Sequence, residues 1–190
     1  MMKFKKNATN QLKNDSLVVF TDYNDCVLTD VTLPNIILNT TSSHEDNNMS
    51  KEQMEFITNC TTLISGDWLH LVDTLESLQI PQTADGITTK YGKFNLILAA
   101  ETTYSLESSK DTAYLLLHHL TLNGVGLVAC KRYYFGVGGG SDAFIKATKG
   151  LVLQDDGIEK TLHFELVRQY NDGKSNIRDL WKVTIASSNK

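Results

Sequence analysis

The residues most able to do chemistry are Glu101, Thr102, Thr103 and Tyr104, which directly follow an apolar run at Phe94–Ala100. A continuous apolar run that ends in polar residues is typical of a parallel strand buried on both faces. Ligands of open α/β sheets bind beyond the carboxyl ends of the strands, so this cluster lies where chemistry is usually done. The alternative is a buried strand that leads into an ordinary polar loop.

Two aspartates occupy comparable positions earlier in the chain. Asp22 follows an apolar stretch at residues 16–20, and Asp67 follows another at residues 61–64. A carboxylate at a strand end can accept hydrogen bonds from both ribose hydroxyls. A carboxylate beside an aromatic ring, as in Asp67 and Trp68, can accept the exocyclic amine of adenine and offer a stacking face. Either aspartate could instead cap the next helix. Together with Glu101, they favour a nucleoside cofactor along one sheet edge.

The elements that would position these clusters alternate along the chain. Apolar spacing predicts strands at residues 16–20, 61–64, 94–100 and 125–130. Helices are expected after residue 24, over 69–78, from 105 to about 123 and from 141, and Pro34 should break the first of them or begin a turn of it. Alternation at 162–167 and 181–185, with a turn at 171–173, predicts an antiparallel hairpin. This order predicts a doubly wound α/β sheet with a reversed edge.

Composition places the chain in a broad class. Its 190 residues suit one domain, and 41% hydrophobic and 21% charged residues are ordinary for a soluble globular protein. The net charge of -4 argues against nucleic acid as a global partner. Three isolated cysteines suit a reducing compartment and give no zinc signature, and no apolar segment reaches the length of a membrane span. We therefore predict a protein of the cytoplasm or nucleus, without a metal site.

Three further features of the sequence are not assigned to a separate functional site. The run from Gly136 to Ser141 lacks the spacing of a phosphate-binding loop and is expected to be a mobile loop on the substrate side. His118 and His119 lie on an amphipathic helix and should be solvated or flank the core. Lys131 and Arg132 are interpreted as a solvated strand end.

Five motifs, in order and spacing, resemble the histidine protein methyltransferase family. They are Phe20-Thr21-Asp22-Tyr23-Asn24, Thr32-Leu33-Pro34-Asn35, Ser65-Gly66-Asp67-Trp68, the stretch from Asn95 to Tyr104, and Tyr134-Phe135-Gly136-Val137-Gly138-Gly139-Gly140. Members of this family are S-adenosylmethionine-dependent enzymes with a Rossmann-like sheet of seven strands. The resemblance implies a methyltransferase domain at residues 16–190, preceded by a basic segment at 1–15 that holds a remnant helix.

The resemblance also implies roles for particular residues. Glu101 and Tyr104 would be catalytic, beside the transferred methyl group and the target imidazole. The cofactor would be bound by Asp22, Asn24, Asp67 and Trp68. The substrate would be bound by Thr102, Tyr134, Phe135 and Gly138. The implied substrate is a histidine of a ribosomal protein, and the implied enzyme is a monomer that binds neither membrane nor nucleic acid.

One departure from the family concerns the start of the domain. The family has a strand and a glycine-rich loop upstream of the Asp22 motif, whereas no glycine precedes Ser16 here. The sequence therefore predicts a sheet that lacks this first strand and its loop, and a fold of poor stability. Two functions remain open: a protein-histidine N-methyltransferase, or an inactive fragment or pseudo-methyltransferase that acts as a protein-interaction module through residues 133–140.

Overall fold

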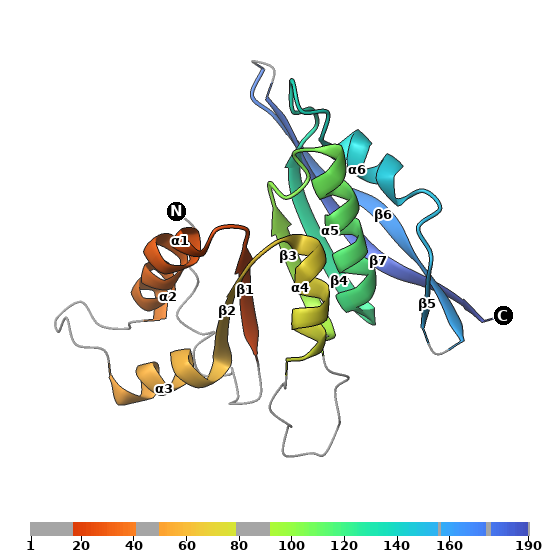
Figure 1. Cartoon of the computed structure of the whole chain (residues 1–190). Coiled ribbons are helices and arrows are strands. Elements are labelled where there is room, and N and C mark those ends of the chain that lie inside the picture. Colours follow the sequence, from red (N-terminus) through yellow and green to blue (C-terminus); the bar gives the residue numbers. More distant parts are fainter. Residues whose placement is uncertain (1–16, 41–49, 79–91, 156, 174–175, 190) are drawn as a thin grey trace. The chain divides into compact units, whose positions relative to one another are not determined.

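The computed structural model describes residues 17–40, 50–78, 92–155, 157–173 and 176–189, which form two compact units (Figure 1). The first unit ends at Asp67, and the second comprises Trp68–Leu78 and the chain from Lys90 onward. The predicted remnant helix at the N-terminus lies outside the described residues. The two units are described separately below.

The first unit contains a strand–helix–strand arrangement that the sequence predicts. Its elements are β1 (Val18–Asp22), α1 (Asp25–Val27), the π-helical η1 (Leu28–Thr32), α2 (Leu33–Thr40), α3 (Lys51–Cys60) and β2 (Thr61–Ser65). The two strands are parallel, with Val18 opposite Thr61 and Asp22 opposite Ser65. α1, η1 and α2 follow one another without a gap, and Pro34 is the second residue of α2, directly after the π-helical turn. The carboxyl ends of β1 and β2 therefore lie side by side.

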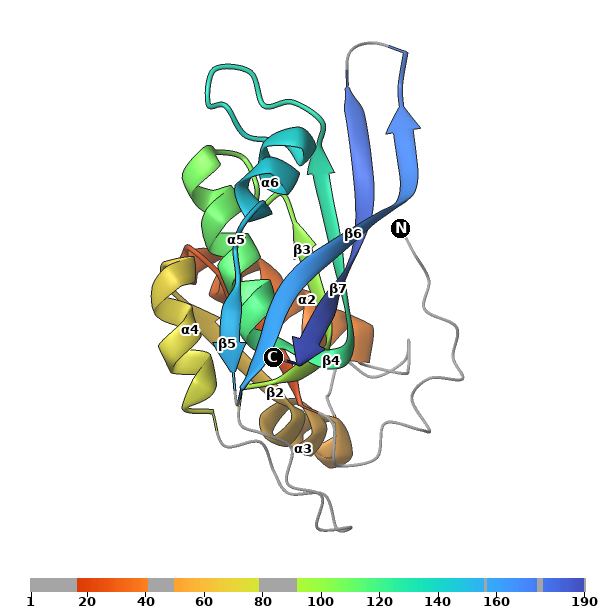
Figure 2. The same cartoon turned by 90° about the vertical axis from the view of Figure 1, so that its right-hand side faces the viewer.

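The second unit is built on a five-stranded sheet of order β3-β4-β7-β6-β5. Its elements are α4 (Trp68–Glu76), β3 (Phe94–Ala100), α5 (Leu106–His119), β4 (Leu120–Lys131), α6 (Ser141–Thr148), β5 (Leu153–Asp155), β6 (Ile158–Asn171) and β7 (Ile177–Asn189). β3 and β4 are parallel, whereas the other three pairs are antiparallel. The predicted C-terminal hairpin is confirmed, and its turn end extends past the helices (Figure 2). The described strands of this unit thus form one mixed sheet with the reversed edge that the sequence predicts, and β1 and β2 form a parallel pair in the first unit.

The core of the second unit lies between the sheet and one layer of helices. α5 packs between α4 and α6, and all three lie on the same side of the sheet (Figure 2). No helix in the described part of the chain is long and apolar enough to cross a membrane. The fully buried core residues come from α5, β4, α6 and β7: Ala113, Leu116, Val128, Phe144 and Val183.

The prediction that β3 is buried on both faces is wrong. Leu96 is 56% exposed and Leu98 is 70% exposed, whereas Ile97 and Ala99 pack against the core. Successive side chains of a strand point to opposite faces, and the helices of this unit cover the face that carries Ile97 and Ala99. β3 is also an edge strand of the five-stranded sheet. A continuous apolar run therefore did not mean two-sided burial within this unit.

The boundary between α5 and β4 also differs from the prediction. The helix was expected to continue to about residue 123, but it ends at His119, and Leu120 is extended, with φ -77° and ψ 133°. Leu116 and Leu117 are buried on α5, and Leu120 is buried at the start of β4. The buried residues therefore keep a helical spacing past the point where the helix ends. The start of α5 agrees with the sequence: the Ser105 hydroxyl accepts from the Ser108 N–H (3.0 Å) in a reciprocal capping box.

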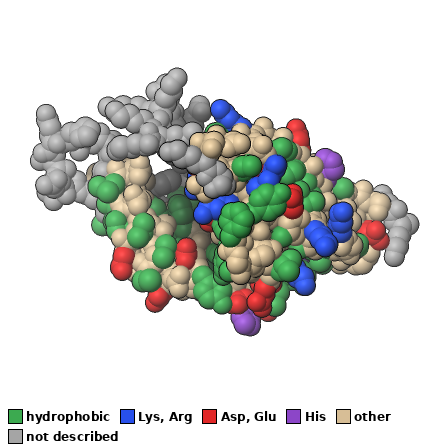
Figure 3. Space-filling model, turned by 90° about the horizontal axis from the view of Figure 1, so that it is seen from above, with side chains coloured by type: hydrophobic (Ala, Val, Ile, Leu, Met, Phe, Trp, Pro, Cys, Tyr) green, Lys and Arg blue, Asp and Glu red, His purple; other side chains and the backbone are tan. Residues whose placement is uncertain are grey.

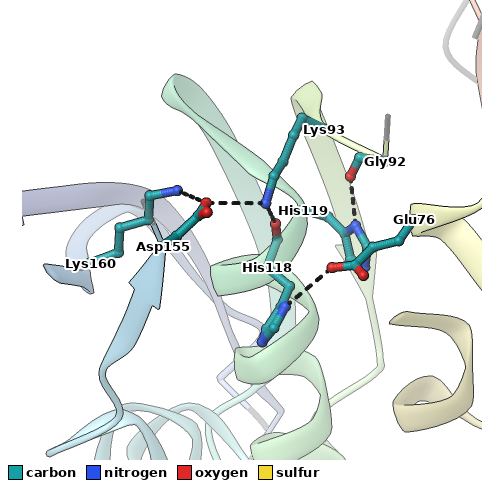
Figure 4. Close-up of polar contacts among 7 residues, drawn as sticks. All are labelled: Glu76, Gly92, Lys93, His118, His119, Asp155 and Lys160. Atoms are coloured by element: carbon teal, nitrogen blue, oxygen red, sulfur yellow. Dashed lines mark hydrogen bonds and ion pairs between the residues drawn. The ribbon is translucent and has the colours of Figure 1, made fainter. Parts of the chain in front are cut away.

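Two histidines lie at the end of α5 in the second unit, His119 fully buried and His118 partly buried (Figure 4). The Nδ1 atom of His119 lies 2.6 Å from the Gly92 carbonyl oxygen, and Nδ1 of His118 lies 3.6 Å from Oε1 of Glu76. Burial lowers the pKa of both imidazoles below the ordinary value, although the Glu76 and Gly92 contacts act in the opposite direction. Both Nε2 atoms are buried without a hydrogen-bond partner among the described residues. These histidines flank the core and are not solvated.

Charged groups beside the histidines connect further elements. The Lys93 ammonium donates to the His118 carbonyl and lies 3.8 Å from Oδ2 of Asp155, which also accepts from Lys160 (Figure 4). These contacts join the start of β3, the end of α5, β5 and β6. Protonation of either imidazole would therefore place a buried positive charge where two ammonium groups already gather.

We expect the stability of the protein to fall as the pH decreases below about 6.5, the ordinary pKa of histidine. The unfolded chain binds protons there, whereas the folded imidazoles, with their lowered pKa values, stay neutral. Each unit of lowering corresponds to about 1.4 kcal/mol. Urea midpoints at pH 7.5 and pH 5.5 measure the effect. His119→Asn should weaken this pH dependence, and His163→Asn, at an exposed histidine of β6, should not; equal pH dependence in all three proteins would contradict the assignment.

Candidate functional site

The candidate site begins where the parallel strands β3 and β4 end together. Glu101 directly follows β3, and its N–H donates to the carbonyl oxygen of Ala129 in β4 (2.9 Å). Its φ of 57° is the one positive value among the non-glycine residues that the structure describes. A left-handed conformation costs a residue with a Cβ atom roughly 1–2 kcal/mol. Strain of this kind gathers at functional sites, and here it redirects the Glu101 side chain away from the strand.

The Glu101 carboxylate meets Tyr134, which lies in the loop after β4. The Tyr134 hydroxyl donates to Oε2 of Glu101 (2.6 Å) and accepts from the Lys131 N–H (3.2 Å). Burial, followed by the hydrogen bond to Glu101, raises the pKa of Tyr134. The phenol therefore keeps its proton and acts as a donor to the carboxylate. The sequence named both residues for separate roles, and the structure brings them into contact.

Two basic residues near this pair were not predicted as part of the site. Arg178 Nε lies 3.8 Å from Oε1 of Glu101, and the Lys131 ammonium lies 5.5 Å from the centre of the Tyr134 ring. The side chains of Arg178 and Glu101 are both about half exposed, so this ion pair is weak. Arg178 was missed because it lies on β7, which pairs with β4 from far along the chain.

The loop at residues 132–140 packs closely on the segment after β3. The Gly140 N–H donates to the Thr103 carbonyl oxygen (2.9 Å), and Gly138 forms an antiparallel bridge with Ser105. A Cβ atom on Gly139 would lie 2.1 Å from the carbonyl carbon of Tyr104, closer than any side chain allows. Glycine is therefore required for close approach of two backbones. This close approach accounts for the glycine at position 139.

The remaining residues predicted after β3 differ in exposure. Thr103 is fully buried, and Thr102 is partly buried, with its carbonyl oxygen accepting from the Thr112 hydroxyl (3.2 Å). Tyr104 is 47% exposed, so its ring can reach a ligand. The hydroxyls of Thr102 and Thr103 are buried and have no hydrogen-bond partner among the described residues. Of the four residues, Glu101 and Tyr104 are thus the most accessible.

An apolar surface surrounds the Glu101–Tyr134 pair. Phe135 is 86% exposed, and Tyr133 and Val137 are about half exposed on the same loop. A pocket of about 200 Å³ lies between this loop and the turn end of the β6–β7 hairpin, and Figure 3 shows hydrophobic side chains beside lysine and arginine at this end of the molecule. Its lining residues are Lys131, Tyr133, Tyr134, Phe135, Val137, Asn176 and Ile177.

Three of the predicted cofactor residues, Asp22, Asn24 and Asp67, lie at or just after the strand ends of the first unit, whereas Trp68 is the first residue of α4 in the second unit. One oxygen of Asp22 accepts from the Asn24 N–H (2.9 Å), and Oδ2 of Asp67 accepts from the Tyr23 hydroxyl (3.1 Å). The Gly66 N–H donates to the Asp22 carbonyl oxygen (3.1 Å), so the two strand ends are held together. Each carboxylate has about four acceptor sites, which fits the hydroxyl and amine donors of a nucleoside. Convergence of these residues with Glu101 stays a prediction, because Glu101 belongs to the second unit.

Carboxylates at the ends of parallel strands are common in α/β proteins that bind nucleoside cofactors at such positions. No protein-family model matches the chain. It is 35% identical over 173 residues to a histidine protein methyltransferase 1 homolog of Dictyostelium discoideum, an alignment that covers 91% of this chain and 44% of that protein. A Bos taurus protein of the same name is 31% identical over 162 residues, covering 75% of this chain and 40% of the relative.

These similarities confirm the resemblance that the five motifs indicate: the chain is related to the histidine protein methyltransferases over most of its length. It spans less than half the length of these curated relatives. Among solved structures, a fibrillarin pre-rRNA processing protein of Methanococcus jannaschii aligns with 87% of this chain and 55% of its own, at 12% identity and a TM-score of 0.46. That similarity is too low to carry an argument about function.

Gly139→Ala should release the loop from the segment after β3, because the added methyl group cannot fit against Tyr104 and Thr103. We expect a destabilisation of roughly 1–3 kcal/mol by urea unfolding, as for overpacking elsewhere. Loss of the Tyr134–Glu101 hydrogen bond should accompany it. Gly136→Ala is the matched control: its φ of 86° adds strain, but nothing lies within 4 Å of the new methyl group. Equal effects of the two substitutions would show that close approach at Gly139 is unimportant.

Proposed function

We propose that the chain is the methyl-transferring part of an S-adenosylmethionine-dependent protein-histidine N-methyltransferase whose substrate is a histidine of a ribosomal protein. The names of its relatives support the reaction class. The observation that carries the assignment to a site is the 2.6 Å hydrogen bond between Tyr134 and Glu101. This bond fixes a half-exposed carboxylate at the carboxyl end of a parallel strand, beside an exposed apolar loop.

The chemistry that this carboxylate can perform is hydrogen-bond acceptance from an imidazole. A neutral imidazole has one nitrogen with a lone pair and one N–H group. If the N–H donates to Glu101, the other nitrogen is left unprotonated and can act as the nucleophile. As the ring gains positive charge, the nearby carboxylate stabilises it. The Tyr134 hydroxyl donates to Oε2 of Glu101 and so holds the carboxylate in one orientation.

The other predicted residues complete this arrangement. Bound S-adenosylmethionine would supply an electrophilic methyl group. Asp22, Asn24, Asp67 and Trp68 would hold its nucleoside through the acceptor sites and the aromatic ring described above. Tyr104, Phe135 and Gly138 would contact the substrate backbone and apolar side chains around the target histidine, and Thr102 would contact it from the partly buried segment after Glu101.

We include in this proposal the finer predictions of fold and place. β1 and β2, together with the strands of the second unit, would belong to the Rossmann-like sheet of seven strands that the resemblance implies. The parallel β1–β2 and β3–β4 pairs and the antiparallel position of β7 support this. Residues 16–190 would then be one monomeric domain that acts in the cytoplasm and nucleus and binds no nucleic acid.

Glu101→Gln should reduce kcat by about 100-fold, the loss typical for one stabilising contact to developing charge. The amide retains the shape of the side chain but removes the negative charge that the imidazolium needs. Methylation of a ribosomal protein is measured with labelled S-adenosylmethionine, and cofactor binding is measured in parallel. Glu107→Gln, at an exposed carboxylate in the first turn of α5, is the control and should be fully active. Unchanged turnover of Glu101→Gln with intact cofactor affinity would refute the role.

The alternative function is a protein-interaction module without catalysis. The exposed side chains of Tyr133, Phe135 and Val137 favour it, since clustered exposed apolar residues mark interaction sites. Cofactor binding separates the two functions.

We expect the purified chain to bind S-adenosylmethionine with micromolar affinity in a calorimetric titration. Asp22→Asn should weaken binding at least 10-fold, because the ribose hydroxyls lose a charged acceptor. Asp25→Asn changes an exposed acid three residues later and should leave the affinity unchanged. Absence of binding by the folded chain would favour the interaction module.

A further inference from the structure

A buried carboxylate that the proposed chemistry does not use lies behind the candidate site. Asp179, on β7, is 1% exposed. Its Oδ2 atom accepts from the Ser141 hydroxyl (2.6 Å) and from Nε of Arg132 (3.2 Å). Its Oδ1 atom accepts from Nε2 of Gln169 on β6 (2.8 Å). One carboxylate therefore connects two strands of the hairpin, the residue after β4 and the first residue of α6.

The two donors to Oδ2 lie at the two ends of one loop. Arg132 immediately precedes residues 133–140, and Ser141 immediately follows them. Arg132 is held further by its backbone N–H, which donates to the Ile177 carbonyl oxygen on β7 (2.8 Å). The prediction that Arg132 belongs to a solvated strand end is wrong, because its guanidinium forms an ion pair with a buried acid. The loop that carries Tyr134 is thus fixed at both ends by one oxygen atom.

The negative charge of Asp179 favours a role in positioning the loop over a role in stabilising the fold. Burial alone would raise the pKa of Asp179, but the hydrogen bonds from Ser141, Gln169 and Arg132 together hold the pKa below its ordinary value. The group is therefore an ionised acceptor with three donors in fixed directions. Buried ion pairs are often replaceable by apolar residues without loss of stability, whereas apolar residues cannot define donor positions.

We propose that Asp179 is a positioning residue that fixes both ends of the loop at residues 133–140 and so holds Tyr134 against Glu101. The consequence for catalysis rests on the function proposed above, but the effect on the loop does not. Asp179 acts as a hydrogen-bond acceptor. No contact among the described residues joins it directly to Glu101 or Tyr134.

The test uses the whole chain with three substitutions. Asp179→Asn keeps the shape of the side chain, but it replaces one acceptor oxygen by an amide NH2 donor and removes the charge. Ser141→Ala removes one donor and leaves the carboxylate paired with Arg132 and Gln169, so it is the milder variant if Asp179→Asn folds poorly. Glu165→Gln is the matched control, since it changes an exposed carboxylate on the same hairpin that pairs with Lys182.

Two measurements report on the loop without any assay of activity. Hydrogen exchange by NMR follows the amides of Tyr134, Gly138 and Gly140, which donate to backbone carbonyls, with Val128 in the core of β4 as the reference. A pH titration of ¹³Cζ-labelled tyrosine, assigned with Tyr134→Phe, follows the Tyr134 phenol. We expect exchange of the three loop amides to become at least 10-fold faster in Asp179→Asn and in Ser141→Ala. The pKa of Tyr134 should fall toward its ordinary value, with Val128 unchanged.

Loop amides and a Tyr134 pKa that match the wild type in the folded variants would overturn the proposal. Equal loss of protection at Val128 in both variants would also overturn it, because Asp179 would then support the whole fold and not the loop. In the methylation assay, the variants should raise KM for the protein substrate more than they lower kcat. If the wild-type chain has no methyltransferase activity, the proposed function fails, while the loop measurements still decide the role of Asp179.

Discussion

The parallel pairing of β3 with β4 is the constraint on which the candidate site depends. It brings the carboxyl ends of the two strands to one edge, where the Glu101 N–H donates to Ala129. The loop after β4 can then lie against the segment after β3. An antiparallel partner for β3 would have brought the amino end of β4 to this place instead. The strained backbone of Glu101 and the contact with Tyr134 both follow from this pairing.

The loop after β4 has two kinds of attachment, which act at different places. Backbone contacts of Gly138 and Gly140 hold its second half on residues 103–105, and the absence of a Cβ atom at Gly139 permits the approach to Tyr104. The Asp179 carboxylate holds both ends from behind. Between these attachments Phe135 remains exposed. The loop is therefore fixed where it meets Glu101 and exposed to solvent at Phe135.

The buried polar groups of the second unit lie at its two ends and act differently. Near the carboxyl end of β4, Asp179 is charged and fully supplied with donors. At the other end of α5, the Nε2 atoms of His118 and His119 have no partner among the described residues. Several donors hold the pKa of Asp179 low despite its burial, whereas burial lowers the pKa of both imidazoles and outweighs the opposite effect of the Glu76 and Gly92 contacts.

The sequence by itself determined the main alternation of strands and helices, although not α3 or β5, and it also indicated the C-terminal hairpin, the family resemblance and the residues Glu101 and Tyr134. These follow from local apolar spacing, from turn residues and from motifs in a fixed order. Only the tertiary structure decided that Leu96 and Leu98 are exposed, that α5 ends at His119, and that Tyr134 meets Glu101. The roles of Arg132, Asp179 and Ser141 belong to the same group. Burial and partners depend on which strands pair and which face the helices cover, and β7 reaches β4 from about 50 residues away in the chain, a distance at which no local pattern acts.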